Sequence, residues 1–140
     1  MLSLYAALAL ANGPAGYVFT SFRGNGDGLH LATSRDGRVW EDTVPVFLKP
    51  EVGSRLFRDG HVLRGPDGVY RMVWTTGWND KGIGYATSRD LVHWSPQRYL
   101  PVMEGVPGTK TCWAPETFFD RKAKRYLITW SSRVDGRYSE

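Results

Sequence analysis

The 140-residue sequence contains a single cysteine, Cys112, so no disulfide can form within the chain. It also lacks an apolar run long enough to span a bilayer. The three histidines, His30, His61 and His93, show no metal-ligand spacing, and no His or Asn context marks Cys112 as a nucleophile. We therefore expect no metal site, no cofactor and no membrane-spanning segment.

The charged residues are too evenly mixed to indicate a nucleic-acid partner. The net charge is +4, and Lys and Arg are scattered among Asp and Glu. The one basic cluster, RKAKR at 121–125, falls where a hairpin turn is expected and is typical of a solvated loop. The Gly-rich segment GNGDG at 24–28 joins two expected strands, so it has no helix N-terminus that would bind a phosphate.

The N-terminal segment MLSLYAALALANG is apolar but lacks a basic n-region, and its apolar run is at the short end for a signal peptide. Ala9-Leu10-Ala11 resembles a small-residue cleavage site. A degenerate secretion signal, an outer strand and an arbitrary start remain alternatives. We keep a secreted or periplasmic location as the expectation.

Aromatic residues and turn formers are abundant. Aromatic residues make up 14% of the chain, and the chain also has 16 Gly and 8 Pro. Aromatic side chains suit both pleated sheets and sugar-stacking surfaces, and many turns favour an all-β fold. The length corresponds to one domain.

One element occurs twice at a fixed distance. The segment GLHLATSRDGRVW at 28–40 returns as GIGYATSRDLVHW at 82–94, an offset of 54 residues. In each copy, residues alternate with the period of two that is typical of a strand. The chain then turns at Ser-Arg-Asp, where short polar side chains close tight turns. Asp36 and Asp90 are therefore predicted to be turn residues, and the following Trp40 and Trp94 structural residues.

The repeated unit predicts four-stranded antiparallel blades of a β-propeller, because four-stranded units at this period are typical of that fold. The expected segments are a blade tail at about 15–47, a full blade at about 57–102 and half a blade at about 112–133. Hydroxyl pairs recur at the ends of the aromatic strands: Thr20-Ser21, Thr75-Thr76 and Ser131-Ser132. With two to two and a half blades, residues 1–140 are expected to be an N-terminal part of a larger propeller domain.

Three segments carry a family resemblance: 56–78, which holds an Arg-Asp strand and an aromatic strand, 82–102, which holds a hairpin, and 111–132, which begins with Thr-Cys-Trp-Ala-Pro-Glu. They resemble the Arg-Asp-Pro and aromatic strands, the blade hairpin and the Trp-Ala-Pro-Asp/Glu strand of the five-bladed β-propellers of glycoside hydrolase family 43. The resemblance implies hydrolysis of glycosidic bonds in plant polysaccharides, with arabinose or xylose as usual sugars, and an inverting mechanism. Such a mechanism needs a carboxylate base and a protonated acid roughly 6.5–9.5 Å apart.

Asp59 matches the aspartate of the Arg-Asp-Pro motif, which implies that it is the general base. The sequence departs from the motif at Gly60, where the family has proline, and glycine loosens the backbone there. A turn aspartate paired with Arg58 or Arg55 is the structural alternative. The resemblance places the general acid in a later blade, beyond residue 140.

The resemblance also implies substrate-binding positions around Asp59. Glu116, in WAPET, would line the pocket, and Arg58 would lie beside it if it reaches the site. Trp113, Trp78 and Trp74 are candidates for stacking on sugars, with a core position as the alternative for Trp74. His61 is expected to be structural.

Two other functions compete with this prediction. A non-catalytic, carbohydrate-binding propeller would account for Gly60, and a sialidase-like propeller would require an arginine cluster with a Tyr nucleophile. We find no such cluster in the sequence. The expected partner is therefore an oligo- or polysaccharide substrate, with no nucleic acid and no membrane.

Overall fold

The structure is a computed structural model that describes residues 16–136. These residues form nine strands and no helix. The described residues therefore contain no helix that could cross a membrane. The strands are β1 (Tyr17–Ser21), β2 (His30–Ser34), β3 (Glu41–Asp42), β4 (Arg58–Arg64), β5 (Tyr70–Thr75), β6 (Ile83–Ser88), β7 (Arg98–Leu100), β8 (Trp113–Asp120) and β9 (Arg125–Ser131). The all-β prediction is confirmed.

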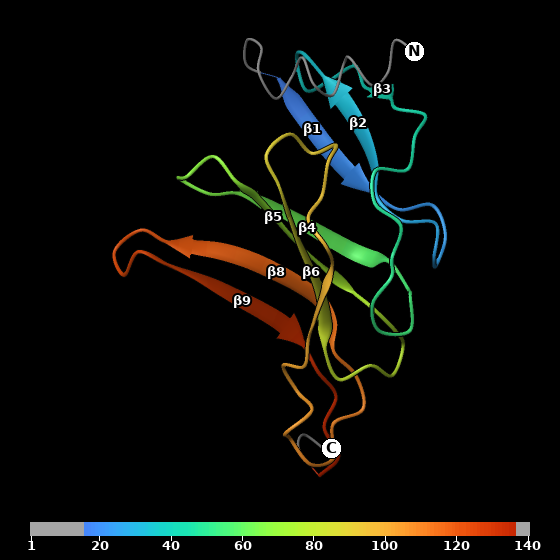
Figure 1. Ribbon diagram of the computed structural model, residues 1–140, viewed down its shortest axis with the longest axis vertical. Coiled ribbons are helices and arrows are strands. Elements are labelled where there is room, and N and C mark those ends of the chain that lie inside the picture. The colour runs from blue at the N-terminus through green and yellow to red at the C-terminus, as the bar shows by residue number, and fades with distance from the viewer. Residues whose placement is uncertain (1–15, 137–140) are drawn as a thin grey trace.

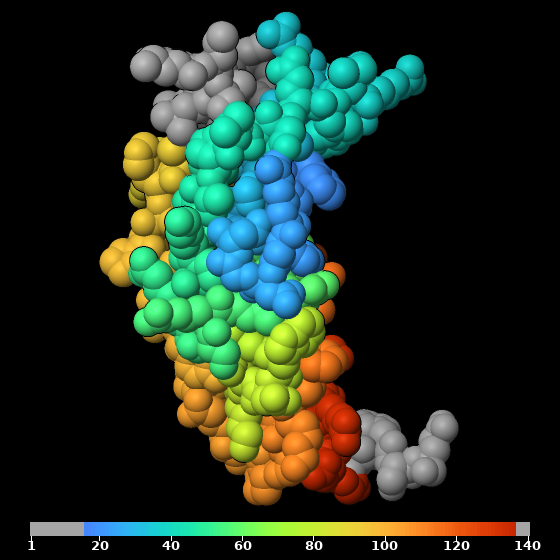
Figure 2. Space-filling view, turned by 90° about the vertical axis from the view of Figure 1, so that its right-hand side faces the viewer, coloured from blue at the N-terminus to red at the C-terminus, as the bar shows by residue number. Residues whose placement is uncertain are grey.

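The strands form three antiparallel sheets in chain order: β1-β2-β3, β4-β5-β6-β7 and β8-β9. Figure 1 shows the sheets following one another along the long axis. In Figure 2 the cyan residues lie at the upper end with the blue residues below them, and the red residues of the third sheet lie toward the lower end. The four-stranded sheet has the antiparallel order predicted for one blade, and the fold is that expected of part of a propeller.

Side chains alternate along the strands as a period of two requires. In β9, Tyr126, Ile128 and Trp130 are half-buried, whereas the residues between them are exposed. The half-buried face of β9 packs on the second sheet. The sequence pattern therefore does determine which face of this strand is covered.

Two hydrophobic clusters join the three sheets. The first contains Leu29, which precedes β2, Leu31 of β2, and Met72 and Trp74 of β5. The second joins Val73 and Ile83 of the second sheet to Cys112, with Ile128 and Trp130 packed against it. Val73 and Trp74 are consecutive residues of β5, so their side chains point to opposite faces of the second sheet. Each side chain belongs to a different cluster, and the second sheet is therefore covered on both faces.

The repeated Ser-Arg-Asp segments adopt the same turn twice. Asp36 accepts hydrogen bonds from the backbone N–H groups of Arg38 and Val39, at 2.8 and 2.9 Å. Asp90 accepts the equivalent bonds from Val92 and His93, at 2.9 and 2.8 Å. Both aspartates are turn residues, as the repeat predicts.

The two tryptophans that follow these turns differ. Trp94 donates its indole N–H to the Leu91 carbonyl at 3.1 Å and packs against the first cluster. Trp40 is 42% exposed and contacts the edge of Phe19 with ring centroids 5.9 Å apart. The structural assignment is therefore well supported for Trp94, whereas Trp40 covers only one neighbouring ring.

The division of residues 1–140 into blades of one partial domain stays a prediction. The weak secretion signal, with its cleavage-like Ala9-Leu10-Ala11, lies outside the described residues. The secreted or periplasmic location stays a prediction.

Candidate active site

Asp59 lies in a bulge near the start of β4. The pairing of β4 with β5 shifts between Arg58 and His61, and Asp59 has φ 53°, a left-handed conformation. Such a conformation costs a non-glycine residue about 1 kcal/mol or more and persists only where neighbours hold it. The bulge turns the Asp59 side chain to the exposed surface.

A second bulge lies beside the first, on β8. The pairing of β8 with β9 shifts between Trp113 and Glu116, and Ala114 has φ 47°. The Thr75 hydroxyl joins the two bulges: it donates to Asp59 Oδ2 at 2.9 Å and accepts the Ala114 N–H at 2.9 Å. The candidate base and the predicted pocket strand are thus brought together.

Arg58 lies between two aromatic rings. Its guanidinium carbon is 4.9 Å from the Phe22 ring centroid and 5.3 Å from that of Trp78. Its Nη1 donates to Asn25 Oδ1 at 3.0 Å. Among the described residues neither Arg58 nor Arg55 forms an ion pair with Asp59, which does not favour the alternative of a turn aspartate held by a salt bridge.

Trp78 and Trp113 form an exposed aromatic pair. Their ring centroids are 6.2 Å apart at 89°, and Trp113 donates its indole N–H to the Trp78 carbonyl at 3.0 Å. Trp78 is 48% exposed and Trp113 38% exposed. Both retain ring surface that a sugar can cover, so the geometry suits the role predicted for them.

Glu116 is exposed on β8, between two cross-links to the second sheet. One is the Thr75–Ala114 bond, and the other runs from the Thr117 N–H to His61 Nδ1 at 3.2 Å. An amide N–H can only donate, so Nδ1 of His61 is the unprotonated nitrogen. His61 therefore holds β8 against β4, which agrees with the structural role expected for it.

Of the two positions weighed for Trp74, the structure favours the core and contradicts the sugar-stacking surface. Its side chain is 0% exposed and stacks on Phe57 with ring centroids 5.7 Å apart. Its ring also fills the space above Gly84, where an added Cβ would lie 2.0 Å from the indole. Trp74 is a core residue and is not available for stacking on a sugar.

The absence of proline at position 60 has a packing cause. A Cβ on Gly60 would lie 2.9 Å from Phe57 Cζ, and Phe57 is fully buried. The equivalent bulge on β8 has Pro115 after its left-handed Ala114, so proline is compatible with this backbone where space allows. At Gly60 the Phe57 ring occupies that space.

A carboxylate outside the bulge anchors the loop that leads into β4. Asp80 accepts hydrogen bonds from the Ser54 N–H at 2.9 Å, the Ser54 hydroxyl at 2.6 Å and the Thr76 hydroxyl at 2.7 Å. Burial raises the pKa of Asp80, but these bonds from Ser54 and Thr76 outweigh it and lower the pKa. Asp80 thus fixes the residues on either side of Trp78.

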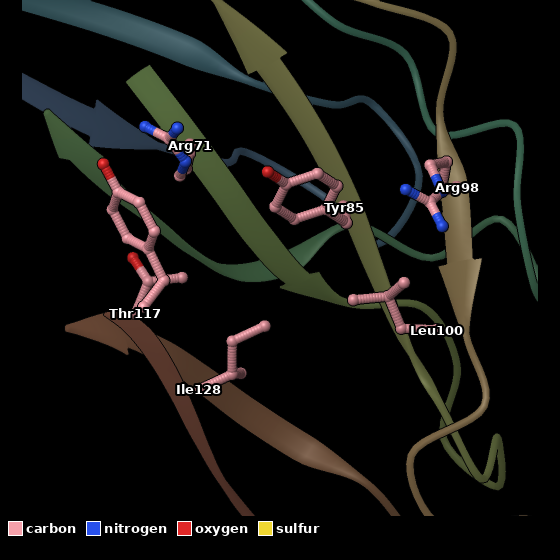
Figure 3. A pocket seen from close by; sticks show the side chains of 7 residues that line it. Arg71, Tyr85, Arg98, Leu100, Thr117 and Ile128 are labelled. Atoms are coloured by element: carbon pink, nitrogen blue, oxygen red, sulfur yellow. The ribbon is translucent and has the colours of Figure 1, made fainter. Parts of the chain in front are cut away.

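A separate cavity of about 270 Å³ lies between the second and third sheets. Figure 3 shows Arg71, Tyr85, Arg98, Leu100, Thr117 and Ile128 around it. Arg71 is already held by Asp67, with Nη2 2.6 Å from Oδ2. None of the predicted site residues lines this cavity, so it is distinct from the Asp59 bulge.

Sequence reasoning missed three residues of the bulge region: Phe22, Asn25 and Thr75. Phe22 and Asn25 come from the loop between β1 and β2, and nothing in their local pattern indicates contact with β4. Thr75 did carry a signal, since its hydroxyl pair recurs with the repeat, but the contact across sheets is not visible in the sequence.

The chain is all-β, and its exposed, strained aspartate is joined through Thr75 to the strand that carries the exposed Trp113. These features are typical of a carbohydrate-active domain. The chain matches the model of a family described as "Probable glycosyl hydrolase domain" over residues 13–139, and it belongs to this family, which is related to glycoside hydrolase family 43. The resemblance predicted from the sequence is thereby confirmed. Membership supports a glycosidase-like role for the domain.

No curated protein matches the chain. Four chains among the solved structures match it. One is the crystal structure of "a putative glycoside hydrolase from Parabacteroides distasonis ATCC 8503", at 22% sequence identity and a TM-score of 0.45. The match covers 86% of this chain and 38% of that one, so this chain spans well under half of the neighbour's length.

Proposed function

We propose that the protein is a glycosidase that hydrolyses arabinofuranosidic or xylosidic bonds of plant polysaccharides by inversion, with Asp59 as general base. The observation that carries the proposal is the bulge that exposes Asp59, which Thr75 joins to Ala114 next to Trp113 and in which the preceding Arg58 lies over the Trp78 ring. Family membership supports the general class of activity. The choice of sugar and the inverting mechanism rest on the resemblance to family 43 propellers.

In this mechanism the Asp59 carboxylate takes a proton from water as that water attacks the anomeric carbon. The indole rings of Trp78 and Trp113 hold a sugar face, and Arg58 and Glu116 offer polar contacts at the rim. The general acid, which protonates the leaving oxygen, comes from another blade of a closed five-bladed propeller. A secreted or periplasmic location would bring such an enzyme to its polysaccharide.

The test replaces the carboxylate while keeping its shape. Asp59→Asn in the intact protein is expected to lower turnover of aryl arabinofuranosides or xylosides by roughly 10²- to 10⁴-fold, since a general base contributes about that factor. Asp36→Asn is the matched control, because Asp36 serves only a turn of the first sheet. The anomer released first, followed by NMR, distinguishes inversion from retention.

Near-normal turnover in the Asp59→Asn protein would remove Asp59 from the mechanism. Calorimetric binding of arabinan or xylan by the unmodified protein, without any turnover, would instead favour the carbohydrate-binding alternative. The two outcomes are separate, because binding is measured on the unmodified protein.

A further inference from the structure

Thr75, the last residue of β5, is 1% exposed and makes two hydrogen bonds through one hydroxyl. The Ala114 N–H can only donate, and the Asp59 carboxylate can only accept. The Thr75 oxygen therefore accepts from Ala114, and its proton points at Asp59 Oδ2; both distances are 2.9 Å. The rotation of the hydroxyl is fixed by its two partners.

Both partners of Thr75 have a strained backbone. Asp59 and Ala114 have φ values of 53° and 47°, and each lies in the bulge of the first strand of its sheet. Strained residues persist where the surrounding structure holds them, and they concentrate at functional sites. Thr75 is the side chain that contacts both bulges.

A related connection is present at another of the described residues. Thr20, 55 residues before Thr75, donates its hydroxyl to the Gly60 carbonyl at 3.4 Å. In both cases a hydroxyl from one sheet reaches the bulge on the first strand of the next sheet. The hydroxyls of Thr20 and Thr75 thus both reach a bulge of the next sheet, and of these two Thr75 also meets a carboxylate, that of Asp59.

We propose that Thr75 is a positioning residue, which holds one oxygen of Asp59 and locks the Asp59 bulge to β8 beside Trp113. The inference rests on the proposed function, because it assigns Thr75 to the carboxylate that acts as base. Holding Oδ2 restricts rotation of the carboxylate and leaves Oδ1 to face the attacking water. A displacement of about 1 Å at such a group is enough to cost roughly 10²-fold in rate.

The first experiment removes the hydroxyl and keeps the shape. Thr75→Val in the intact protein is expected to lower kcat on an aryl glycoside by about 10- to 100-fold, with KM changed less than about threefold. Thr75→Ser restores the hydroxyl and is expected to retain kcat within about threefold. Thr43→Val is the matched control, since Thr43 is equally buried and its hydroxyl bonds only the Leu31 carbonyl of the first sheet.

A double-variant cycle separates positioning from general weakening of the fold. If Thr75 acts through Asp59, Thr75→Val adds no further loss once Asp59→Asn is present. Wild-type kcat in the Thr75→Val protein, or an equal loss in the presence and absence of Asp59→Asn, would overturn the inference. Neither result would affect the assignment of Asp59, which depends on Asp59→Asn alone.

A second measurement does not require activity. Hydrogen exchange of the Ala114 amide, followed by NMR, is expected to accelerate about tenfold in Thr75→Val, because this N–H loses its acceptor. Thr43→Val is expected to leave the Ala114 amide unchanged. Unchanged exchange in Thr75→Val would refute the lock between the bulges even if Asp59 proved not to be the base.

Discussion

At the scale of single residues, steric contact with Phe57 explains why position 60 has glycine where the family motif has proline. The Gly60 backbone faces a buried Phe57 ring that stacks on Trp74. The sequence suggested that glycine loosens the carboxylate-bearing strand. The structure shows instead that the missing side chain makes room for the aromatic core beneath the bulge.

We therefore predict that Gly60→Ala destabilises the protein by about 1–3 kcal/mol, as expected for overpacking of a closed core. The added Cβ would lie 2.9 and 3.0 Å from two Phe57 ring carbons. Urea unfolding measures the effect, and Gly105→Ala is the matched control, since no atom lies within 4 Å of its added Cβ. Equal stability of the two variants would show that Phe57 moves freely.

The sequence predicted some site residues and not others for a physical reason. Asp59, Arg58, Trp78 and Trp113 lie in motifs read along one strand or loop, and the structure brings them together. Trp74 was ambiguous because an aromatic residue in a strand suits a core and a sugar surface equally well. Its burial depends on Phe57 and Gly84, which only the folded sheet places against it.

At the scale of elements, strands and turns follow closely from the local pattern, whereas bulges do not. Alternation and the 54-residue repeat predict the strands, and Asp36 and Asp90 close the turns that the repeat indicates. A bulge is a mismatch between two paired strands, so it depends on both sequences and on their register. The bulges at Asp59 and Ala114 are therefore invisible in either strand alone.

The second repeated turn predicts a pH dependence of stability. Burial raises the pKa of Asp90, but hydrogen bonds from the His93 side chain, two backbone N–H groups and Ser88 outweigh it and lower the pKa to about 2. A pKa depressed in the folded state adds stability above the ordinary value of about 4, which is lost as pH falls toward 2. The Asp90 charge thus contributes up to about 2 kcal/mol at neutral pH.

Asp90→Asn is the test, because asparagine keeps an oxygen that accepts from the backbone and removes the charge. We expect the variant to be less stable than the unmodified protein at pH 7, and the difference in unfolding free energy to shrink between pH 4 and pH 2. Thermal or urea unfolding across this range measures it. A difference that stays constant down to pH 2 would mean that the charge of Asp90 does not stabilise the turn.

At the scale of the whole molecule, the candidate site depends on all three sheets. The loop after β1 supplies Phe22 and Asn25 around Arg58, the second sheet supplies Asp59, and the third supplies Trp113. The two hydrophobic clusters lie on opposite faces of the second sheet and join it to its neighbours. The site should therefore be lost when any one of the sheets separates.

This coupling predicts that a destabilising substitution in the first cluster also lowers the stability of the second cluster. Leu31 is fully buried in the first sheet, and Leu31→Ala is expected to cost about 2–5 kcal/mol. Cys112 is fully buried in the second cluster, and burial raises the pKa of its thiol to about 11, so a thiol reagent at pH 8 reacts only with opened molecules.

If the sheets unfold together, Leu31→Ala lowers the urea midpoint for Cys112 labelling and the midpoint for tryptophan fluorescence by the same amount. Val44→Ala is the control, because Val44 is 83% exposed and its truncation is expected to shift neither midpoint. A Cys112 midpoint unchanged by Leu31→Ala would mean that the third sheet and its half of the second unfold independently of the first. The site would then open by release of the loop that holds Arg58, with Asp59 and Thr75 still in place.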